Sequence, residues 1–171
     1  MINNKQLTER SFTPSQLSGF DGAHSIQLPV DFIHDLSKAD SLQAVLDTIA
    51  YWISHVFDAD RASITLQDTE EYLKLYSISG NHAIPMDFKI PIGQTFVGRV
   101  FAQSQLIICD DLAQSDELDC KMLSEHGMGT CMDAPMIHNG VCIGTLNVAD
   151  INVNITTPYN KRFFYRVSPL G

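Results

Sequence analysis

The chain has 171 residues, a hydrophobic fraction of 44%, a charged fraction of 18% and a net charge of −9. This length fits one domain with a sizeable core. Because nucleic acids and anionic membranes attract Lys and Arg, the acidic balance argues against both as partners. No apolar run approaches the roughly 20 residues of a membrane helix. Residues 1–22 also lack the apolar stretch of a signal peptide, so we expect a cytoplasmic protein.

The four cysteines stand at positions 109, 120, 131 and 142, with an even spacing of eleven residues. Zinc sites need close pairs such as C-x2-C, so this spacing predicts no metal site. The cysteine density is also too low for a small disulfide scaffold. We therefore expect reduced thiols, some of them buried as small apolar side chains.

The first part of the chain predicts a lead-in followed by two helices. Residues 1–28 carry few apolar side chains and no clear period, which is typical of a tail or a loosely packed segment. Pro29 suits the first position of a helix, and Asp40 and Ser41 can cap a second one. This second helix has the clearest helical stripe in the chain, formed by Leu42, Val45, Leu46, Ile49, Trp52, Ile53 and Val56.

Alternating hydrophobicity then predicts strands. Residues 61–67 place Ser63 and Thr65 on the face opposite the apolar side chains. Residues 71–79 follow after a tight connection and complete a β-hairpin. Residues 88–91 end in proline, which cannot donate a ladder hydrogen bond, so they predict a short edge strand.

The remaining elements alternate between short helices and strands. Thr95 can cap a helix that ends near Ser104. Residues 106–109 predict a brief buried strand, and residues 118–125 predict a short helix stopped by glycines.

The last predicted element is a hairpin with arms at residues 130–137 and 141–148. Its turn, His138-Asn139-Gly140, contains Asn-Gly, the strongest local hairpin signal. The complete order is α-α-β-β-β-α-β-α-β-β. This order predicts an α+β domain in which helices pack against a mostly antiparallel sheet.

Several sequence motifs, in this order and spacing, resemble those of the GAF domain, the small-ligand sensor module of signalling proteins. They are Ala59-Asp60-Arg61-Ala62-Ser63-Ile64, Pro91-Ile92-Gly93 with Val97-Gly98-Arg99-Val100, Ile108-Cys109-Asp110-Asp111, and Ala134-Pro135-Met136-Ile137 with Gly144-Thr145-Leu146. The resemblance implies a central antiparallel sheet of the GAF/PAS-like kind, with the terminal helices on one face. A helix and loop lid, residues 87–131, would cover a pocket on the other face.

The resemblance also divides the chain and implies a function. The GAF-like domain would span residues 29–158, after the tail at 1–28 and before a short C-terminal helix or tail at 159–171. We expect a noncatalytic sensor or regulatory module that binds a small ligand in signal transduction; the identity of the ligand or of any cofactor stays open. The expected ligand-binding residues are Phe96, Arg99, Val100, Asp111, Met122, His126, Met128 and Thr130.

The terminal helices of GAF domains suggest the partners. We expect a homodimer formed through neighbours of Leu42, Leu46 and Ile49. GAF domains usually run into a long helix that leads to an output domain, so a signalling output domain or partner protein is also expected. Residues 159–167 would form the beginning of such a helix.

The GAF-fold free methionine-(R)-sulfoxide reductases offer an alternative function. Their catalytic cysteine lies about ten residues past the start of an acidic loop, as Cys120 follows Asp110. The cysteine that these enzymes carry before the first lid helix is absent here. Cys109 or Cys131 would therefore have to serve as the thiol that resolves a sulfenic acid.

A pigmented sensor is a further alternative. Cys120 lies near the position where bilin-binding GAF domains attach their chromophore, although Lys121 stands where those domains carry His. His126, at the expected pocket mouth, can ligate haem iron. A solvent-facing histidine favoured by the helix dipole explains His126 more simply. Asp150-Ile151 replaces the Asn-Lys of phosphodiesterase-type GAF domains, which disfavours a cyclic nucleotide.

Overall fold

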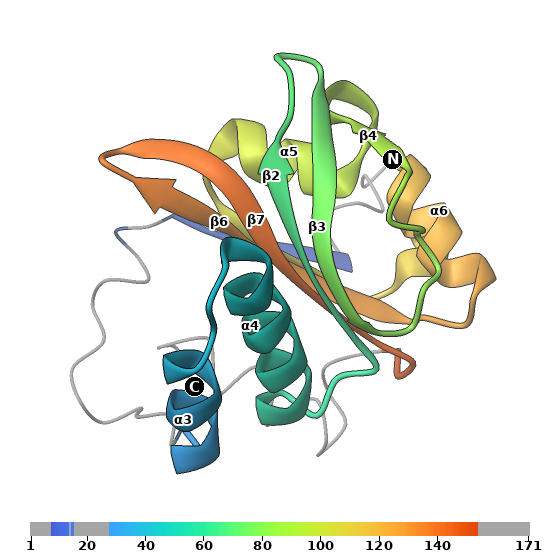
Figure 1. Ribbon diagram of the computed structural model, residues 1–171. Helices are drawn as coiled ribbons and strands as arrows, with labels where there is room; N and C mark the ends of the chain where they lie inside the picture. The colour runs from blue at the N-terminus through green and yellow to red at the C-terminus, as the bar shows by residue number, and fades with distance from the viewer. Residues whose placement is uncertain (1–7, 14, 16–27, 154–171) are drawn as a thin grey trace.

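The computed structural model describes residues 8–13, 15 and 28–153, and Figure 1 shows their arrangement. The strands are β1 (Glu9–Phe12), β2 (Arg61–Gln67), β3 (Tyr72–Gly80), β4 (Lys89–Pro91), β5 (Leu106–Cys109), β6 (Thr130–His138) and β7 (Val141–Asp150). The helices are α3 (Val30–Ser37), α4 (Leu42–Val56), α5 (Phe96–Gln103) and α6 (Leu118–Glu125), with 3-10 turns η2 (Ile92–Gln94) and η3 (Leu112–Gln114). None of these helices is long and apolar enough to cross a membrane.

The strands form one seven-stranded sheet in the order β1-β5-β6-β7-β2-β3-β4, and every pairing is antiparallel. Helices α3 and α4 lie on one face of the sheet, and α5 and α6 lie on the other (Figure 1). This arrangement confirms the predicted α+β fold. The predicted strands and helices between residues 30 and 150 are also confirmed, while the predicted helix after residue 158 lies outside the described residues.

Two predicted caps explain where helices begin. The Ser41 hydroxyl accepts a hydrogen bond from the Ala44 amide at the start of α4. The Thr95 hydroxyl accepts one from the Gly98 amide at the start of α5. Such side chains satisfy amides that have no partner within the helix. Helix α4 then packs Leu46 and Ala50 against Ile64 of β2.

The two ends of the sheet differ in how well the sequence predicts them. β4 is an edge strand, as Pro91 indicated. β1 forms the opposite edge, where it pairs with β5 and buries Phe12. The sequence did not predict β1, because its partner lies about a hundred residues away and only four residues take part.

The final hairpin has the predicted turn, since Asn139 and Gly140 both have positive φ, at 50° and 78°. A type I′ turn requires this conformation at both central positions. Further along β7, a Cβ on Gly144 would collide with the backbone carbonyl of Thr65 on β2. Glycine at this position therefore allows β7 to lie close to β2.

Asp60, just before β2, connects three segments. Its backbone carbonyl accepts a hydrogen bond from the Asn81 amide at 2.9 Å, at the start of the β3–β4 connection. Its carboxylate accepts one from the Ile151 amide at 2.9 Å, just after β7. The entry to β2, the exit from β3 and the exit from β7 are thus held together by one residue.

Candidate functional site

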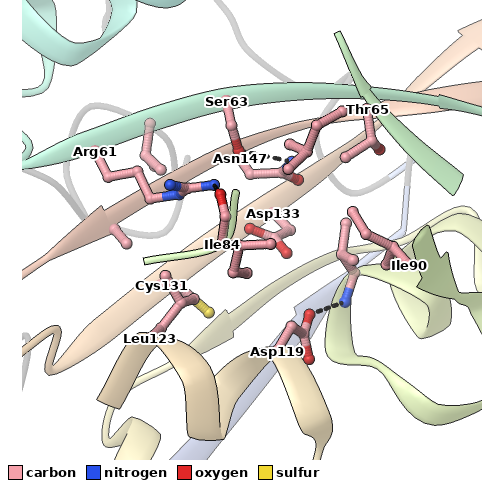
Figure 2. Close-up of a pocket in the computed structure, with 14 residues that line it drawn as sticks. Arg61, Ser63, Thr65, Ile84, Ile90, Asp119, Leu123, Cys131, Asp133 and Asn147 are labelled. Atoms are coloured by element: carbon pink, nitrogen blue, oxygen red, sulfur yellow. Dashed lines mark hydrogen bonds between the residues drawn. The ribbon is translucent and has the colours of Figure 1, made fainter. Parts of the chain in front are cut away.

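A small internal cavity lies between the sheet and the lid helices α5 and α6. Its volume is about 30 Å³, close to the share of one water molecule in the liquid. Figure 2 shows its lining. The residues are Arg61, Ser63, Thr65, Leu75, Ile84, Ile90, Val97, Asp119, Leu123, Cys131, Asp133, Asn147, Val148 and Ala149.

The polar floor of the cavity follows from strand register. Across β6, β7 and β2, Asp133 pairs with Asn147, and Asn147 pairs with Ser63. Because residues directly opposite one another in paired strands share a face of the sheet, these side chains form one row. The next row on the same face contains Cys131 and Arg61. Alternation in β2 predicted that Ser63 and Thr65 face away from the apolar side chains; the structure shows that they face this cavity rather than solvent.

Arg61 is a buried cation at one end of the floor, only 3% exposed. Its guanidinium donates to the backbone carbonyls of Asn81 and Ile84, both in the loop between β3 and β4. Burial lowers the pKa of Arg61 to about 10, while the nearby Asp133 opposes this shift. Arg61 therefore stays charged at neutral pH and ties the loop to the sheet.

Asp133 and Asn147 are buried acceptors without donors. Within the described part of the chain, no hydrogen bond or ion pair reaches the Asp133 carboxyl group, which is 5% exposed. Burial raises the pKa of Asp133 well above its usual range, and Arg61 only partly offsets this effect. The Asn147 amide nitrogen donates to Ser63 Oγ at 3.3 Å, but its buried Oδ1 has no partner among the described residues. Such groups normally find a partner, either in the protein or in ordered water.

Asp119 of α6 holds the two lid helices together. Its carboxylate accepts hydrogen bonds from the Phe96 amide at 2.8 Å and the Val97 amide at 3.0 Å, both in the first turn of α5. It also accepts one from its neighbour, the Cys120 amide, at 3.0 Å. Burial raises the pKa of Asp119, and the three amide donors oppose this effect. A carboxylate at a helix N-terminus is further favoured by the helix dipole.

Three of the four thiols gather beneath the lid. Cys109 and Cys131 pair across β5 and β6, and Cys120 of α6 joins them in the same core cluster. Donation from Cys120 and then from Cys131 lowers the pKa of Cys109, whereas the interaction with Cys109, together with burial, raises the pKa of Cys120. Of the three, only Cys131 lines the cavity. Among the described residues, no group of His, Cys, Asp or Glu is arranged to hold a metal ion.

The eight residues expected to bind a ligand lie elsewhere in the lid and the adjoining core. None of them lines the cavity, and whether any contacts a ligand stays a prediction. The apolar side chains and Thr130 pack inward; Phe96, Val100, Met128 and Thr130 are buried, and Met122 is partly buried.

The three polar residues of that set have partners within the protein. Arg99 forms ion pairs with Glu117 at 2.9 Å and Glu9 at 2.8 Å. The Asp111 carboxylate accepts the Ala113 amide at 3.1 Å and caps η3. The exposed His126 ring lies at the end of α6, with Nδ1 2.9 Å from the Met122 carbonyl oxygen. These residues stabilise the lid rather than face the cavity.

The cavity residues were not identified from the sequence, although a signal for them exists. Polar residues alternate at 61, 63 and 65 in β2, at 131 and 133 in β6, and at 145 and 147 in β7. On an outer face, such alternation indicates solvent. Here lid helices cover this face, so the same alternation indicates a polar pocket.

Several solved structures have folds similar to that of this chain. The GAF domain of a phosphoenolpyruvate-protein phosphotransferase from Coxiella burnetii superposes with a TM-score of 0.64 at 17% identity, covering 78% of this chain and 81% of its own. Free methionine-R-sulfoxide reductase from Neisseria meningitidis, in complex with its substrate, gives 0.63 at 16% identity, covering 84% and 89%. The chromophore-binding domain of a Stigmatella aurantiaca phytochrome gives 0.56 at 16% identity, covering 80% and 54%.

At these identities the structural matches show the fold alone. No curated protein sequence matches the chain. The model of the GAF domain family, however, matches residues 41–167, which is most of the sequence. The chain therefore belongs to the GAF domain family.

Proposed function

We propose that this GAF domain is a noncatalytic sensor or regulatory module of cytoplasmic signalling that binds a small ligand between the sheet and the lid. The observation that supports this most directly is the buried Asn147 Oδ1, which has no partner among the described residues, next to an Asp133 carboxyl group to which the described residues donate no hydrogen bond. Burying such groups without partners costs free energy. A bound molecule that donates hydrogen bonds to these groups would offset this cost.

The structural relatives support the binding of a small molecule. One similar structure is a reductase in complex with its substrate, and another is a chromophore-binding domain. We propose residues 29–158 as the ligand-binding unit, to which β1 is added at the edge of the sheet. The cavity has room for about one water molecule, so a larger ligand requires the lid or the loop at residues 81–88 to move.

The proposed homodimer would involve α3 and α4. Leu42 of α4 is 64% exposed, and Val30 and Ile33 of the preceding helix, α3, are exposed as well. Leu46, which was also expected at this interface, is buried against the sheet. A dimer surface on these helices would therefore use Leu42 and the exposed side chains of α3.

A metabolite screen by thermal shift tests the sensor proposal. We expect at least one compound to raise the Tm of the wild-type protein and to lose this effect in Asn147→Leu, which keeps the branched shape of the side chain but has no amide. Asp68→Asn, an exposed residue of the β2–β3 turn, is the control and should respond like the wild type. If no compound stabilises a protein that denaturant titration shows to be folded, the domain is a structural dimer module instead.

The three gathered thiols favour a second candidate, a thiol enzyme that reduces free methionine sulfoxide. In that reaction a thiolate takes the oxygen as a sulfenic acid, a second thiol forms a disulfide with it and releases water, and an external thiol restores both. Cys120 is fully buried, whereas Cys131 reaches the cavity. Turnover assays with a thiol reductant, comparing the wild type with Cys120→Ser and Cys131→Ser, test this candidate; equal activity in all three proteins would exclude it.

A further inference from the structure

We propose that the cavity recognises a small aliphatic zwitterion, with its carboxylate at Arg61 and its ammonium group at Asp133 and Asn147. This inference rests on the proposed sensor function and names the class of ligand. The three side chains project into the same cavity from β2, β6 and β7, as Figure 2 shows.

The acceptor side of the cavity lacks donors. Asp133 and Asn147 are direct cross-strand neighbours, so a single group can reach both side chains. An ammonium group has three N–H donors and no acceptor. It can therefore donate to the Asp133 carboxylate and to the Asn147 Oδ1 at the same time. Among the described residues, Asn147 Oδ1 has no partner and no hydrogen bond reaches the Asp133 carboxyl group.

The other side of the cavity carries a fixed positive charge. The Arg61 guanidinium donates hydrogen bonds to two neutral backbone carbonyls, those of Asn81 and Ile84. A guanidinium has five N–H donors, and it binds a carboxylate more strongly than a neutral carbonyl. A ligand carboxylate would thus add to these contacts or replace them. Replacement would release the loop between β3 and β4.

The spacing of the two sides suits a molecule whose opposite charges are close together. Arg61 and Asp133 lie close enough that the charge of each shifts the pKa of the other. A ligand that contacts both sides must therefore carry its opposite charges close together. An α-amino acid carries its ammonium group and its carboxylate on the same carbon atom.

Simple ions fit this site less well. A lone cation would be repelled by the positive charge of Arg61. A lone anion would leave Asp133 and Asn147 without hydrogen-bond donors. A zwitterion is neutral overall and satisfies both ends. The apolar part of the lining, with Leu75, Ile84, Ile90 and Val97 among its members, favours a short aliphatic side chain.

Charges around Asp133 give the inference a second readout. Asp119 on α6, Arg61 on β2, Cys109 on β5 and Glu117 before α6 all act on this carboxyl group. Burial raises the pKa of Asp133 and so favours its protonated form in the empty site, whereas an ammonium partner would favour the ionised form. Binding of a zwitterion should therefore release up to one proton at neutral pH.

Isothermal titration calorimetry on the full chain tests the proposal with defined probes. Glycine, L-alanine and L-valine are the zwitterions; propionate and ethylammonium are L-alanine without its ammonium group or its carboxylate. We expect at least one amino acid to bind, with propionate and ethylammonium at least tenfold weaker than L-alanine. The binding enthalpy should change with the ionisation enthalpy of the buffer, because a proton is released.

The variants separate recognition from folding. Asp133→Asn and Asn147→Leu should each weaken amino-acid binding at least tenfold, whereas Asn147→Asp keeps an acceptor and should retain binding. Asp68→Asn is the matched exposed control. If a variant fails to fold, the proton release and the two half-ligands still test the proposal on the wild-type protein.

Three results would overturn the inference. The first is equally tight binding of propionate or ethylammonium, and the second is amino-acid binding unaffected by folded Asp133→Asn and Asn147→Leu proteins. The third is no binding of any amino acid while a compound from the metabolite screen stabilises the protein in an Asn147-dependent way. In all three cases the cavity can still be a ligand site, so the sensor proposal stands. The sensor proposal fails only if no compound of any class binds.

Discussion

The buried Asp133 side chain makes the stability of the folded protein depend on pH. It is 5% exposed and has no donor among the described residues, so its ionised form is poorly solvated. A neutral carboxyl group is therefore favoured in the folded protein, as the raised pKa indicates. The same carboxyl ionises near its ordinary pKa in the unfolded chain. Ionisation of Asp133 thus favours unfolding.

Asp133→Asn should remove this dependence on pH. Because the folded pKa is raised, the stability that the protonated carboxyl provides is complete below its unfolded pKa of about 3.9 and is lost as the pH rises. The variant should gain stability relative to the wild type between about pH 4 and pH 7. The gain should grow as the pH rises through this range. Denaturant unfolding at several pH values measures it, and a difference that is constant with pH would contradict this assignment.

Thiol exposure gives a second prediction at this scale. Cys142 is 9% exposed, whereas Cys109, Cys120 and Cys131 are at most 3% exposed. Access limits the reaction of a buried thiol, even where neighbours lower its pKa as at Cys109. A disulfide reagent should therefore modify Cys142 first in the native protein, and Cys142→Ser should remove the fastest phase. A fast phase that persists in this variant would show that the lid opens readily over the other thiols.

At the scale of elements, polar contacts join the two lid helices. The Asp119 side chain reaches from α6 to the first amides of α5, while the Thr95 hydroxyl satisfies the next one. Arg99 adds ion pairs from α5 to Glu117 before α6 and to Glu9 of β1. The two helices are thereby joined through polar contacts as well as apolar packing. Movement of one helix must displace or break these contacts.

Asp119→Ala should therefore destabilise the protein strongly. It leaves two buried amides of α5 without an acceptor, and each such donor costs about 1–3 kcal/mol. We expect a loss of about 2–4 kcal/mol in the free energy of unfolding, measured by urea titration. Asp116→Ala, at an exposed position in the loop before α6, should change it by less than about 0.5 kcal/mol. Equal effects of the two substitutions would contradict a specific role for Asp119.

For the whole molecule, the sequence predicted what local patterns determine. The stripe of α4, the alternation of β2 and the Asn139-Gly140 turn are short-range signals, and each predicted its element correctly. β1 depends instead on backbone pairing with β5, far away in the chain, and its four residues show no period. Strand pairs of this kind cannot be predicted from one segment alone.

The candidate site was harder to predict for a related reason. Motif positions drew attention to the lid, where Arg99, Asp111 and His126 have partners within the protein. The cavity is built from the sheet, where Asp133 and Asn147 become neighbours only through strand register. Tertiary structure decides whether an alternating polar residue meets solvent or a pocket.

The added strand β1 has a consequence for the stability of the whole sheet. Deletion of residues 1–13 would expose the edge of β5 and remove Phe12 from the core. We expect a loss of about 3 kcal/mol or more, as for large buried aromatic side chains. Self-association should also increase, because β5 is wholly apolar apart from Cys109 and would become an unprotected edge. Deletion of residues 1–7, which leaves β1 intact, is the control; thermal melts and light scattering should distinguish the two, and identical behaviour would contradict a structural role for β1.

Asp60 gives the cavity a direct route to the end of β7. Its carbonyl holds the first amide of the loop that Arg61 also binds, and its carboxylate holds the Ile151 amide. A displacement of this loop would therefore act on the residue that also holds the point where the chain leaves the sheet. Asp60 is thus a shared anchor for the loop beside the cavity and for the end of β7.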